Sequence, residues 1–258
     1  MSSRSVIRFE NVTKTFGTRA VLDHFSFEAR EGEILFILGR SGMGKSVTLK
    51  HIVGLLRPDS GRVFVNDAEV SKLSERELGP IRARCGMVFQ HPALLDSLTV
   101  RQNVSFGLIG SEWTPEKIQN RVRETLGYVQ LGPDVLDRKP PEISYGMQKR
   151  VSLARTLAPG PSILLFDEPT TGLDPITTTA VSDLILRLSR ELGTTSLVVS
   201  HDMPSALRTA DRILVLDQGK ILALGTPAEI ERSHEPLVQD FLKEALELRR
   251  LASEESSP

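Results

Sequence analysis

The segment GRSGMGKS, residues 39–46, decides the fold of this chain. It follows the apolar run EILFILG, which is typical of a strand buried on both faces, and it precedes a helical pattern that stops at Arg57 and Pro58. The glycines allow main-chain N–H groups to wrap an anion, and the start of a helix adds a favourable field for negative charge. An accidental glycine-rich turn would not require this strand and this helix beside it. The segment therefore predicts a phosphate-binding loop.

Two polar side chains at the end of this loop have the chemistry that a nucleoside triphosphate requires. The ammonium group of Lys45 would reach the terminal phosphates, and the hydroxyl group of Ser46 would bind Mg²⁺. The nucleotide-binding residues expected in this segment and at the position after it are Gly39, Arg40, Ser41, Gly42, Met43, Gly44, Lys45, Ser46 and Val47.

Polar side chains also follow two later apolar runs. The run ILLFDE places Asp167 and Glu168 where a strand ends, at the edge of an α/β sheet where ligands bind. There Asp167 would hold Mg²⁺, and Glu168 would act as general base on the attacking water. His201 follows the run SLVVS and could position that water. Taken alone, the acids could form a solvated turn and the histidine could be a packed or surface residue, but the phosphate loop favours the functional interpretation.

The composition limits the classes of protein that remain. The 258 residues carry a net charge of −1, with 40% hydrophobic and 25% charged residues, which indicates one large core or a core with a subdomain. This balance argues against a nucleic-acid-binding surface. The single cysteine, Cys85, excludes an intrachain disulfide, favours a reducing compartment and is interpreted as a small buried hydrophobic residue. We find no signal peptide and no apolar run near the ~20 residues of a membrane span, so a membrane role would need a partner.

The remaining pattern predicts an α/β fold with a helical insertion. Strand patterns occupy both ends of the chain, whereas residues 91–159 have mainly helical character. One helix should begin at Thr114 and Pro115, and another at Ser144 in the stretch EISYGMQKR. Gln218 and Gly219 predict a hairpin turn. The final amphipathic helix is expected from about Leu237 to Leu251, followed by a frayed tail.

The order of these motifs resembles that of the ATP-binding cassette (ABC) ATPases, and the resemblance covers nearly the whole chain. Ser144 and Gly146 fall at the family's signature turn. The resemblance implies that two copies pack head to tail, so that each signature turn closes over the ATP held by the other copy's phosphate loop. It also implies a P-loop NTPase fold with a mainly parallel core sheet and an antiparallel β layer. The implied reaction is hydrolysis of ATP to ADP and phosphate, with ATP and Mg²⁺ bound.

The family pattern assigns further roles. Phe16 falls at the aromatic residue that stacks on adenine, with a core phenylalanine as the alternative. Gln90 falls at the glutamine that senses Mg²⁺ and the γ-phosphate. Asp174 falls at the loop that meets the second copy, and it should also cap the helix that starts at Pro175. The implied catalytic residues are Glu168, His201, Lys45 and Gln90. The implied metal ligands are Ser46, Gln90 and Asp167.

The resemblance also implies a domain organisation. The nucleotide-binding core with its β layer is expected at 1–92 and 159–235, the helical signature subdomain at 93–158, and a C-terminal helix and tail at 236–258. The final helix could dock on its own domain or, as the less favoured alternative, grip the second copy or a small accessory protein.

The signature departs from the common Leu-Ser-Gly-Gly-Gln. Met147 in its last position resembles the ATPases of Mla/Mce-type systems, which move phospholipids or related lipids across bacterial envelopes. This resemblance implies a permease, a lipid-binding protein and a place at the cytoplasmic face of the inner membrane. Tyr145 replaces a glycine of the pattern, and its ring could either point away from the nucleotide or slow closure of the dimer.

Three alternatives remain at this point. The chain could serve an ABC transporter for another substrate. It could be a soluble ABC ATPase that acts on DNA or ribosomes, although its single cassette and near-zero net charge disfavour this. It could also be a nucleotide-gated module that does not hydrolyse ATP, which only Tyr145 suggests. The transported substrate and the direction of transport do not follow from the sequence.

Overall fold

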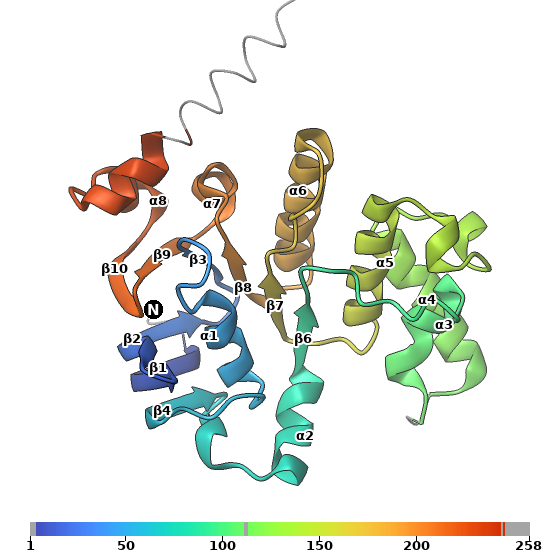
Figure 1. The fold of residues 1–258 in the computed structure, drawn as a ribbon. Coiled ribbons are helices and arrows are strands. Elements are labelled where there is room, and N and C mark those ends of the chain that lie inside the picture. Colours follow the sequence, from blue (N-terminus) through green and yellow to red (C-terminus); the bar gives the residue numbers. More distant parts are fainter. Residues whose placement is uncertain (1–3, 111–112, 244, 246–258) are drawn as a thin grey trace, which may run out of the picture. The chain divides into compact units, whose positions relative to one another are not determined.

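The computed structural model describes residues 4–110, 113–243 and 245. The chain divides into two compact units: Met1–Ile81 with Thr195–Pro258 is unit 1, and Arg82–Thr194 is unit 2. The predicted α/β class is confirmed, because strands that pair in parallel alternate with helices along the chain (Figure 1). The subdomain expected at 93–158 lies inside unit 2, and its own borders stay a prediction.

The N-terminal part of unit 1 is an antiparallel sheet with the strand order β2-β1-β4-β5. Its strands are β1 (Ser5–Phe16), β2 (Arg19–Arg30), β4 (Ser60–Val65) and β5 (Ala68–Glu69). Phe9 stacks on Phe27 with ring centroids 4.9 Å apart, and it meets Phe25 edge-on at 5.8 Å. All three rings are buried, so this aromatic cluster is the core of the β layer.

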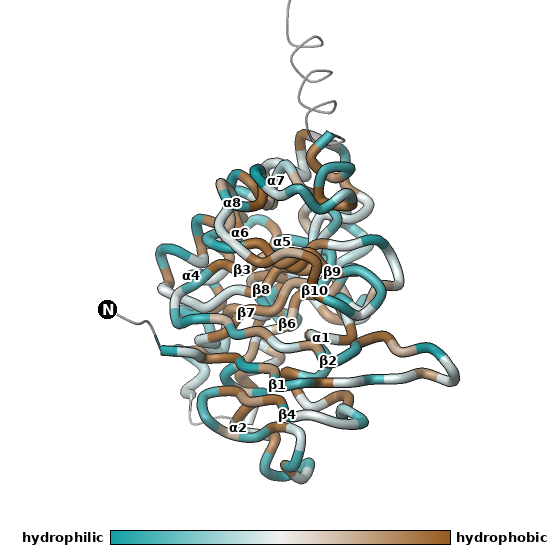
Figure 2. The backbone as a smooth tube through the Cα atoms, turned by 90° about the vertical axis from the view of Figure 1, so that its left-hand side faces the viewer, coloured by the Kyte–Doolittle hydropathy of each residue, from teal (hydrophilic) through white to brown (hydrophobic). Residues whose placement is uncertain are grey.

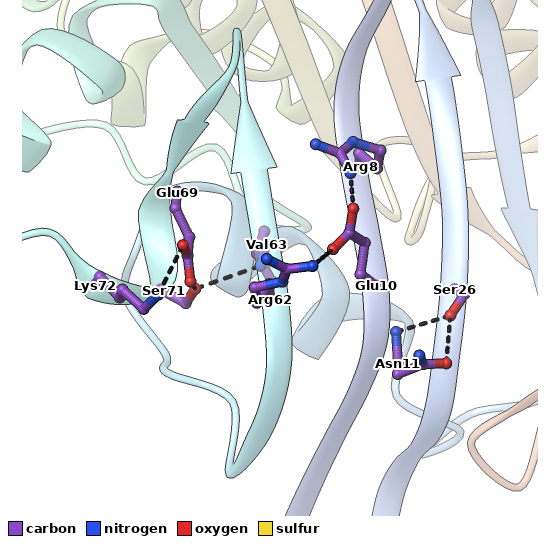
Figure 3. Close-up of polar contacts among 9 residues, drawn as sticks. All are labelled: Arg8, Glu10, Asn11, Ser26, Arg62, Val63, Glu69, Ser71 and Lys72. Atoms are coloured by element: carbon purple, nitrogen blue, oxygen red, sulfur yellow. Dashed lines mark hydrogen bonds and ion pairs between the residues drawn. The ribbon is translucent and has the colours of Figure 1, made fainter.

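The polar residues of the same layer pair both within and across its strands (Figure 3). Glu10 lies between Arg8 and Arg62 and forms an ion pair with each of them. The main-chain N–H of Asn11 donates to Ser26 Oγ at 2.8 Å. Because solvent-facing ion pairs contribute only about 0–1 kcal/mol, the buried aromatic rings hold this layer together more than its charges do.

The second sheet region of unit 1 contains the strand that leads into the phosphate loop. Its strands, in the order β10-β9-β3-β8, are β10 (Lys220–Gly225), β9 (Arg212–Asp217), β3 (Ile34–Leu38) and β8 (Thr195–Ser200). Strand β3 is parallel to both of its neighbours, and all five of its residues are buried, as its apolar run predicts. The hairpin turn predicted at Gln218 and Gly219 is confirmed, with positive φ at both residues.

The helices of unit 1 are short. They are α1 (Lys45–Ile52), the 3₁₀ turn η1 (Val70–Lys72), α7 (Met203–Thr209) and α8 (Pro227–Glu231). Helix α2 (Glu75–Arg84) runs from unit 1 into unit 2. Residues 236–243 are helical and bury Val238 and Phe241, and the predicted continuation of this helix to Leu251 lies outside the described residues. Figure 2 shows the apolar stretches of this unit along its strands, including β3 and β8.

Unit 2 combines a parallel strand pair with a group of helices. The strands are β6 (Cys85–Val88) and β7 (Ile163–Asp167). The helices are α3 (Val100–Ser105), η2 (Phe106–Leu108), α4 (Pro115–Tyr128), η3 (Pro133–Val135), η4 (Pro140–Glu142), α5 (Tyr145–Leu157) and α6 (Pro175–Glu191). Helices α3 and α4 both pack on α5. Both predicted helix starts are confirmed: the side chains of Thr114 and Ser144 each accept a hydrogen bond from the first turn of their helix.

Across the described parts of both units, we find no helix with the length and apolar content that a bilayer crossing demands.

Candidate nucleotide-binding and hydrolysis site

The glycines of the phosphate loop stand where neighbouring main chain leaves no room for a side chain. A Cβ atom on Gly39 would be 2.3 Å from the carbonyl oxygen of Leu216, and one on Gly44 would be 2.5 Å from that of Val21. Gly44 also has a φ of 100°, which L residues rarely adopt. The loop between β3 and α1 therefore exposes main chain rather than side chains, and such a loop can approach a phosphate closely.

Helix α1 begins at Lys45 without a side-chain cap. By contrast, helices α3, α4, α5, α6, α7 and α8 each begin with a Ser, Thr or Asp side chain that accepts from a main-chain N–H group. Phosphate oxygens can accept hydrogen bonds from the same N–H groups at the start of a helix. The missing cap thus coincides with the place where the sequence predicts an anion.

Lys45 lies inside the loop that precedes it. Its Nζ atom is 2.7 Å from the carbonyl oxygen of Gly39 and 3.1 Å from that of Arg40, and the residue is only 6% exposed. Arg19 of β2 reaches the outer side of the loop, with Nη2 3.2 Å from the carbonyl oxygen of Gly42. No sequence motif indicates Arg19, because it is a single arginine in a hairpin, and only the packing of β2 beside the loop shows this contact.

Phe16 and His201 occupy exposed positions at strand ends of the same unit. Phe16 ends β1, its side chain is 48% exposed, and Lys14 Nζ lies 5.6 Å from the centroid of its ring. His201 directly follows β8 and is exposed. Because Leu38 and Ser200 are register partners in neighbouring parallel strands, the loop and His201 leave the sheet at one edge. The exposed ring of Phe16 disfavours the alternative of a core phenylalanine, while its stacking on adenine stays a prediction.

Unit 2 gathers its predicted site residues at the ends of two strands. Val88 pairs with Phe166 in the parallel strands β6 and β7, so the residues that follow them leave at the same edge. Gln90 is exposed there, and Asp167 and Glu168 are half-buried. Glu168 has a φ of 49°, a left-handed conformation that is uncommon for residues other than glycine. This edge is where open α/β sheets bind ligands, as the sequence predicts.

The signature turn forms the exposed N-terminus of α5. Ser144 Oγ accepts a hydrogen bond from the main-chain N–H of Met147 at 3.3 Å. The hydroxyl group of Tyr145 lies 3.3 Å from Nδ1 of His91, and its ring lies close to Gly172. The Tyr145 ring is thus held by residues of its own chain. That Ser144 and Gly146 act on a nucleotide stays a prediction.

Asp174 is the N-cap of α6, as predicted. Its Oδ1 accepts from the main-chain N–H of Thr177 at 3.0 Å, and its Oδ2 accepts from the Thr177 hydroxyl at 2.6 Å. These hydrogen bonds, the one from the hydroxyl first, hold the pKa of Asp174 below its usual value. Its predicted contact with a second copy stays a prediction.

The predicted magnesium ligands are Ser46, in the first turn of α1, and Gln90 and Asp167, at the ends of β6 and β7. Within the described residues, no group of three or more His, Cys, Asp or Glu side chains could hold a metal ion. The predicted set is instead a hydroxyl, an amide and one carboxylate, to which nucleotide phosphates would add oxygens. An all-oxygen set with few protein ligands fits Mg²⁺, which is usually bound in this way.

Comparison with known proteins places these motifs in a family. The family model described as "ABC transporter" matches residues 22–171. The methionine import ATP-binding protein MetN 2 of Rhodococcus jostii (strain RHA1) is 42% identical over 229 residues, which covers 87% of this chain and 67% of that protein. The glycine betaine/carnitine/choline transport ATP-binding protein OpuCA of Bacillus subtilis (strain 168) is 36% identical over 247 residues, which covers 95% of this chain and 63% of that protein. The chain therefore spans about two thirds of the length of these relatives.

Solved structures with the same fold confirm the predicted fold class. CbiO1 from Clostridium perfringens, part of the ABC transporter complex CbiONQ, has a TM-score of 0.83 and 28% identity, and the match covers 98% of this chain and 99% of that one. A dimeric post-hydrolysis state of the ATP-binding cassette MJ0796, bound to ADP and Pi, has a TM-score of 0.79 and 34% identity. That match covers 86% of this chain and 98% of MJ0796.

The names of these relatives do not support lipid transport, which the resemblance to Mla/Mce-type ATPases implies. Their names concern methionine and betaine-type solutes, not lipids. The resemblance to Mla/Mce-type ATPases depends mainly on Met147, a single residue, whereas the identity to the methionine-import protein extends over 229 residues. The comparisons therefore support the coarser interpretation of an ATP-binding transporter subunit.

Proposed function

This chain belongs to the ABC transporter family, and from that premise we propose that it is the ATP-hydrolysing subunit that drives a separate membrane permease. ATP hydrolysis coupled to transport, with ATP and Mg²⁺ bound, is the activity of the family. The observation that carries the proposal is the start of α1: a glycine loop without a side-chain cap, with Lys45 buried inside it. The permease is proposed because the relatives compared above are named as ATP-binding proteins for import or transport.

The proposed reaction is attack of water on the γ-phosphorus of ATP. Glu168 accepts a proton from the attacking water, and the bond between the γ-phosphorus and the β–γ bridging oxygen breaks. Lys45 and the N–H groups at the start of α1 offset the charge on the phosphates. His201, beside the phosphate loop in the register of β3 and β8, donates a hydrogen bond to the γ-phosphate and orients the water.

Binding of the nucleotide uses the remaining predicted residues. The exposed ring of Phe16 stacks on the adenine, and the loop 39–47 encloses the phosphates. Ser46, Gln90 and Asp167 hold Mg²⁺, which neutralises phosphate charge when it is bound.

The active form that we propose is a dimer of two copies with ATP between them. Ser144 and Gly146 at the start of α5 lie over the γ-phosphate held by the other copy, where a helix N-terminus favours an anion. Asp174 lies in the same interface. The exposed position of Ser144 supports this arrangement, and the structurally similar MJ0796 is dimeric. Because ATP binds the closed dimer better than the open form, ATP shifts the equilibrium toward closure, and hydrolysis releases it.

Two substitutions test the chemistry. Glu168→Gln should abolish turnover but keep ATP binding, so that ATP-dependent dimers accumulate in size-exclusion chromatography. Lys45→Ala should instead weaken nucleotide binding itself. Normal steady-state hydrolysis by Glu168→Gln would remove Glu168 from its proposed role.

A cross-link tests the dimer. Ser41→Cys and Ser144→Cys are combined with Cys85→Ser, and ATP is trapped by Glu168→Gln. Cross-links between chains that require ATP support the head-to-tail dimer. Cross-links that form only within one chain would contradict it.

The cargo that the relatives favour is a small zwitterionic or quaternary ammonium solute taken up into the cell. Methionine, glycine betaine and carnitine, named for these relatives, share this chemistry. In such a system the partners are a permease and a substrate-binding protein, and the chain works at the cytoplasmic face of the inner membrane.

Lipid transport is the second candidate, which Met147 in the signature favours. The partners would then include a lipid-binding protein and a small accessory protein. The copurified complex with its permease separates the two candidates, because ATPase activity should be stimulated by the correct cargo. The assay compares methionine and glycine betaine, offered with the copurified binding protein, with phospholipid vesicles. Copurification of DNA or ribosomes without a membrane protein would favour the soluble ABC ATPase instead.

A further inference from the structure

Side chains of α5 hold the loop that follows β6, and all of these contacts lie within unit 2. Nζ of Lys149 donates to the main-chain carbonyl of Gln90. Nη1 of Arg155 donates to the carbonyl of Ala93 at 2.8 Å. The Tyr145 hydroxyl lies 3.3 Å from Nδ1 of His91. The loop at residues 90–93 is therefore tied along the length of the helix that begins at the signature turn.

Lys149 also binds a second segment. Its Nζ atom donates to the carbonyl of Pro169 at 3.0 Å, in the turn after β7. The side chain is 4% exposed, and Nζ lies 5.5 Å from the centroid of the Tyr145 ring. Burial lowers the pKa of Lys149. A buried ammonium costs free energy that an apolar side chain would avoid, so this position calls for a reason beyond packing.

The two carbonyls belong to segments that the proposed function uses. One is the carbonyl of Gln90 itself, and the other is that of the residue after Glu168. Glu168 has a φ of 49°, and such a conformation persists only where its surroundings hold it. The bond from Lys149 to the next carbonyl, together with the hydrogen bond from the N–H of Thr171 to the carbonyl of Glu168 at 3.2 Å, provides that restraint.

We propose that Lys149 is a positioning residue that fixes Gln90 and Glu168 relative to each other and to Ser144 at the start of the same helix. The inference rests on the proposed function and deepens it. Ser144 would contact the nucleotide of the other copy, whereas Gln90 and Glu168 would act on the chain's own nucleotide. The ammonium group of Lys149 therefore joins three segments into one rigid element. They are the loop that contains Gln90, the turn that contains Glu168 and the start of α5 at Ser144.

The same contacts give Tyr145 a role in the signature turn. Its ring covers Lys149, and its hydroxyl binds the residue after Gln90. A glycine at this position could do neither. Tyr145, which departs from the common signature, thus adds a contact within its own chain rather than a new contact with the nucleotide.

The test uses the full chain with its permease and compares Lys149→Met, Lys149→Gln and the parent. Methionine keeps the length of the side chain but removes the donors, while glutamine keeps a donor without the charge. We expect Lys149→Met to lower kcat about tenfold, equivalent to about 1.4 kcal/mol in the barrier, with KM for ATP within about twofold. Lys149→Gln should recover part of this loss. Arg155→Met is the control that loosens the loop at Ala93 without touching Pro169, and it should lower kcat less.

Hydrogen exchange measured by mass spectrometry separates positioning from a general loss of structure. In Lys149→Met, exchange should rise in segments 89–94 and 168–173 and stay unchanged in the β layer. A kcat within twofold of the parent, or unchanged exchange in both segments, would overturn the proposal. A rise in KM for ATP, together with a general rise in hydrogen exchange, in both Lys149 variants would also overturn the proposal. If Lys149→Met does not fold, the proposal is tested by comparing Lys149→Gln with the parent, again by kcat and by hydrogen exchange.

The proposed function is tested by a different experiment, the Glu168→Gln substitution. If Glu168→Gln traps ATP-bound dimers while Lys149→Met turns over ATP like the parent, only the positioning role is wrong. If Glu168→Gln hydrolyses ATP normally, the proposed function fails whatever the Lys149 variants do.

Discussion

Gly39 and Leu216 meet main chain to main chain, so closely that a Cβ atom on Gly39 would be 2.3 Å from the carbonyl oxygen of Leu216. The contact arises because β3 and β9 are parallel neighbours, with Leu38 opposite Val215. The phosphate loop therefore starts at a point fixed by the main chain of the adjacent strand. A side chain at Gly39 would have to displace that strand or the loop.

From this contact we expect Gly39→Ala to weaken ATP binding by more than about tenfold, or about 1.4 kcal/mol. Gly42→Ala is the matched control, because its Cβ would have nothing within 4 Å and only the positive φ of 77° is unfavourable. That strain costs roughly 1 kcal/mol. Titration with a fluorescent ATP analogue gives both dissociation constants, and a weaker effect at Gly39 than at Gly42 would contradict the steric argument.

Tyr145 is held by its own chain, and this leads to a prediction for its substitution. Tyr145→Phe keeps the ring over Lys149, so ATP turnover of the complex should stay within about twofold of the parent. Tyr145→Gly loses the ring and places a glycine in a helix, so turnover should fall. Faster turnover in Tyr145→Gly would show instead that the tyrosine slows closure, and turnover equal to the parent would exclude such slowing.

His51 on α1 predicts a pH dependence of stability. It is buried, and its Nδ1 lies 2.7 Å from the carbonyl oxygen of Val47. Burial, the largest cause, holds the pKa of His51 below its usual 6.5. The unfolded chain therefore binds a proton here more readily than the folded chain, so this site lowers the free energy of unfolding as the pH falls below 6.5 and has no effect well above it.

His51→Gln removes this titration. Urea unfolding at several values between about pH 5 and pH 7 should give a shallower dependence on pH for the variant than for the parent. If the free energy of unfolding depends on pH equally in the variant and the parent over this range, His51 does not contribute to the pH dependence of stability.

Cys85 predicts a difference in reactivity between the folded and unfolded chain. Burial raises the pKa of its thiol to about 12, but the residue as a whole is half-buried and not fully buried as the sequence predicts. Because the thiolate is the nucleophile, iodoacetamide at about pH 8 should leave the native protein unmodified and add one label per chain in urea. Mass spectrometry counts the label, and rapid modification of the native protein would contradict the raised pKa of the thiol.

The sequence by itself determined the features that local patterns encode. The loop between β3 and α1, the complete burial of β3, and the helix caps at Thr114, Ser144 and Asp174 all follow from neighbouring residues. Each depends on steric and hydrogen-bonding preferences that act over a few positions. Family resemblance then extended these patterns to the ATPase fold, but one methionine in the signature was too little to fix the cargo.

Only the tertiary structure decided which distant residues meet. Lys149 lies on α5, where Val151 and Ala154 are buried, and the helical period of about 3.6 residues would place the lysine on the opposite face, toward water. Instead it binds the carbonyl of Gln90, 59 positions earlier in the chain. Arg19 likewise reaches the phosphate loop only because β2 packs beside it. Hydrogen bonds to main-chain carbonyls leave no trace in local sequence, since every residue offers the same acceptor and packing alone selects which one is reached.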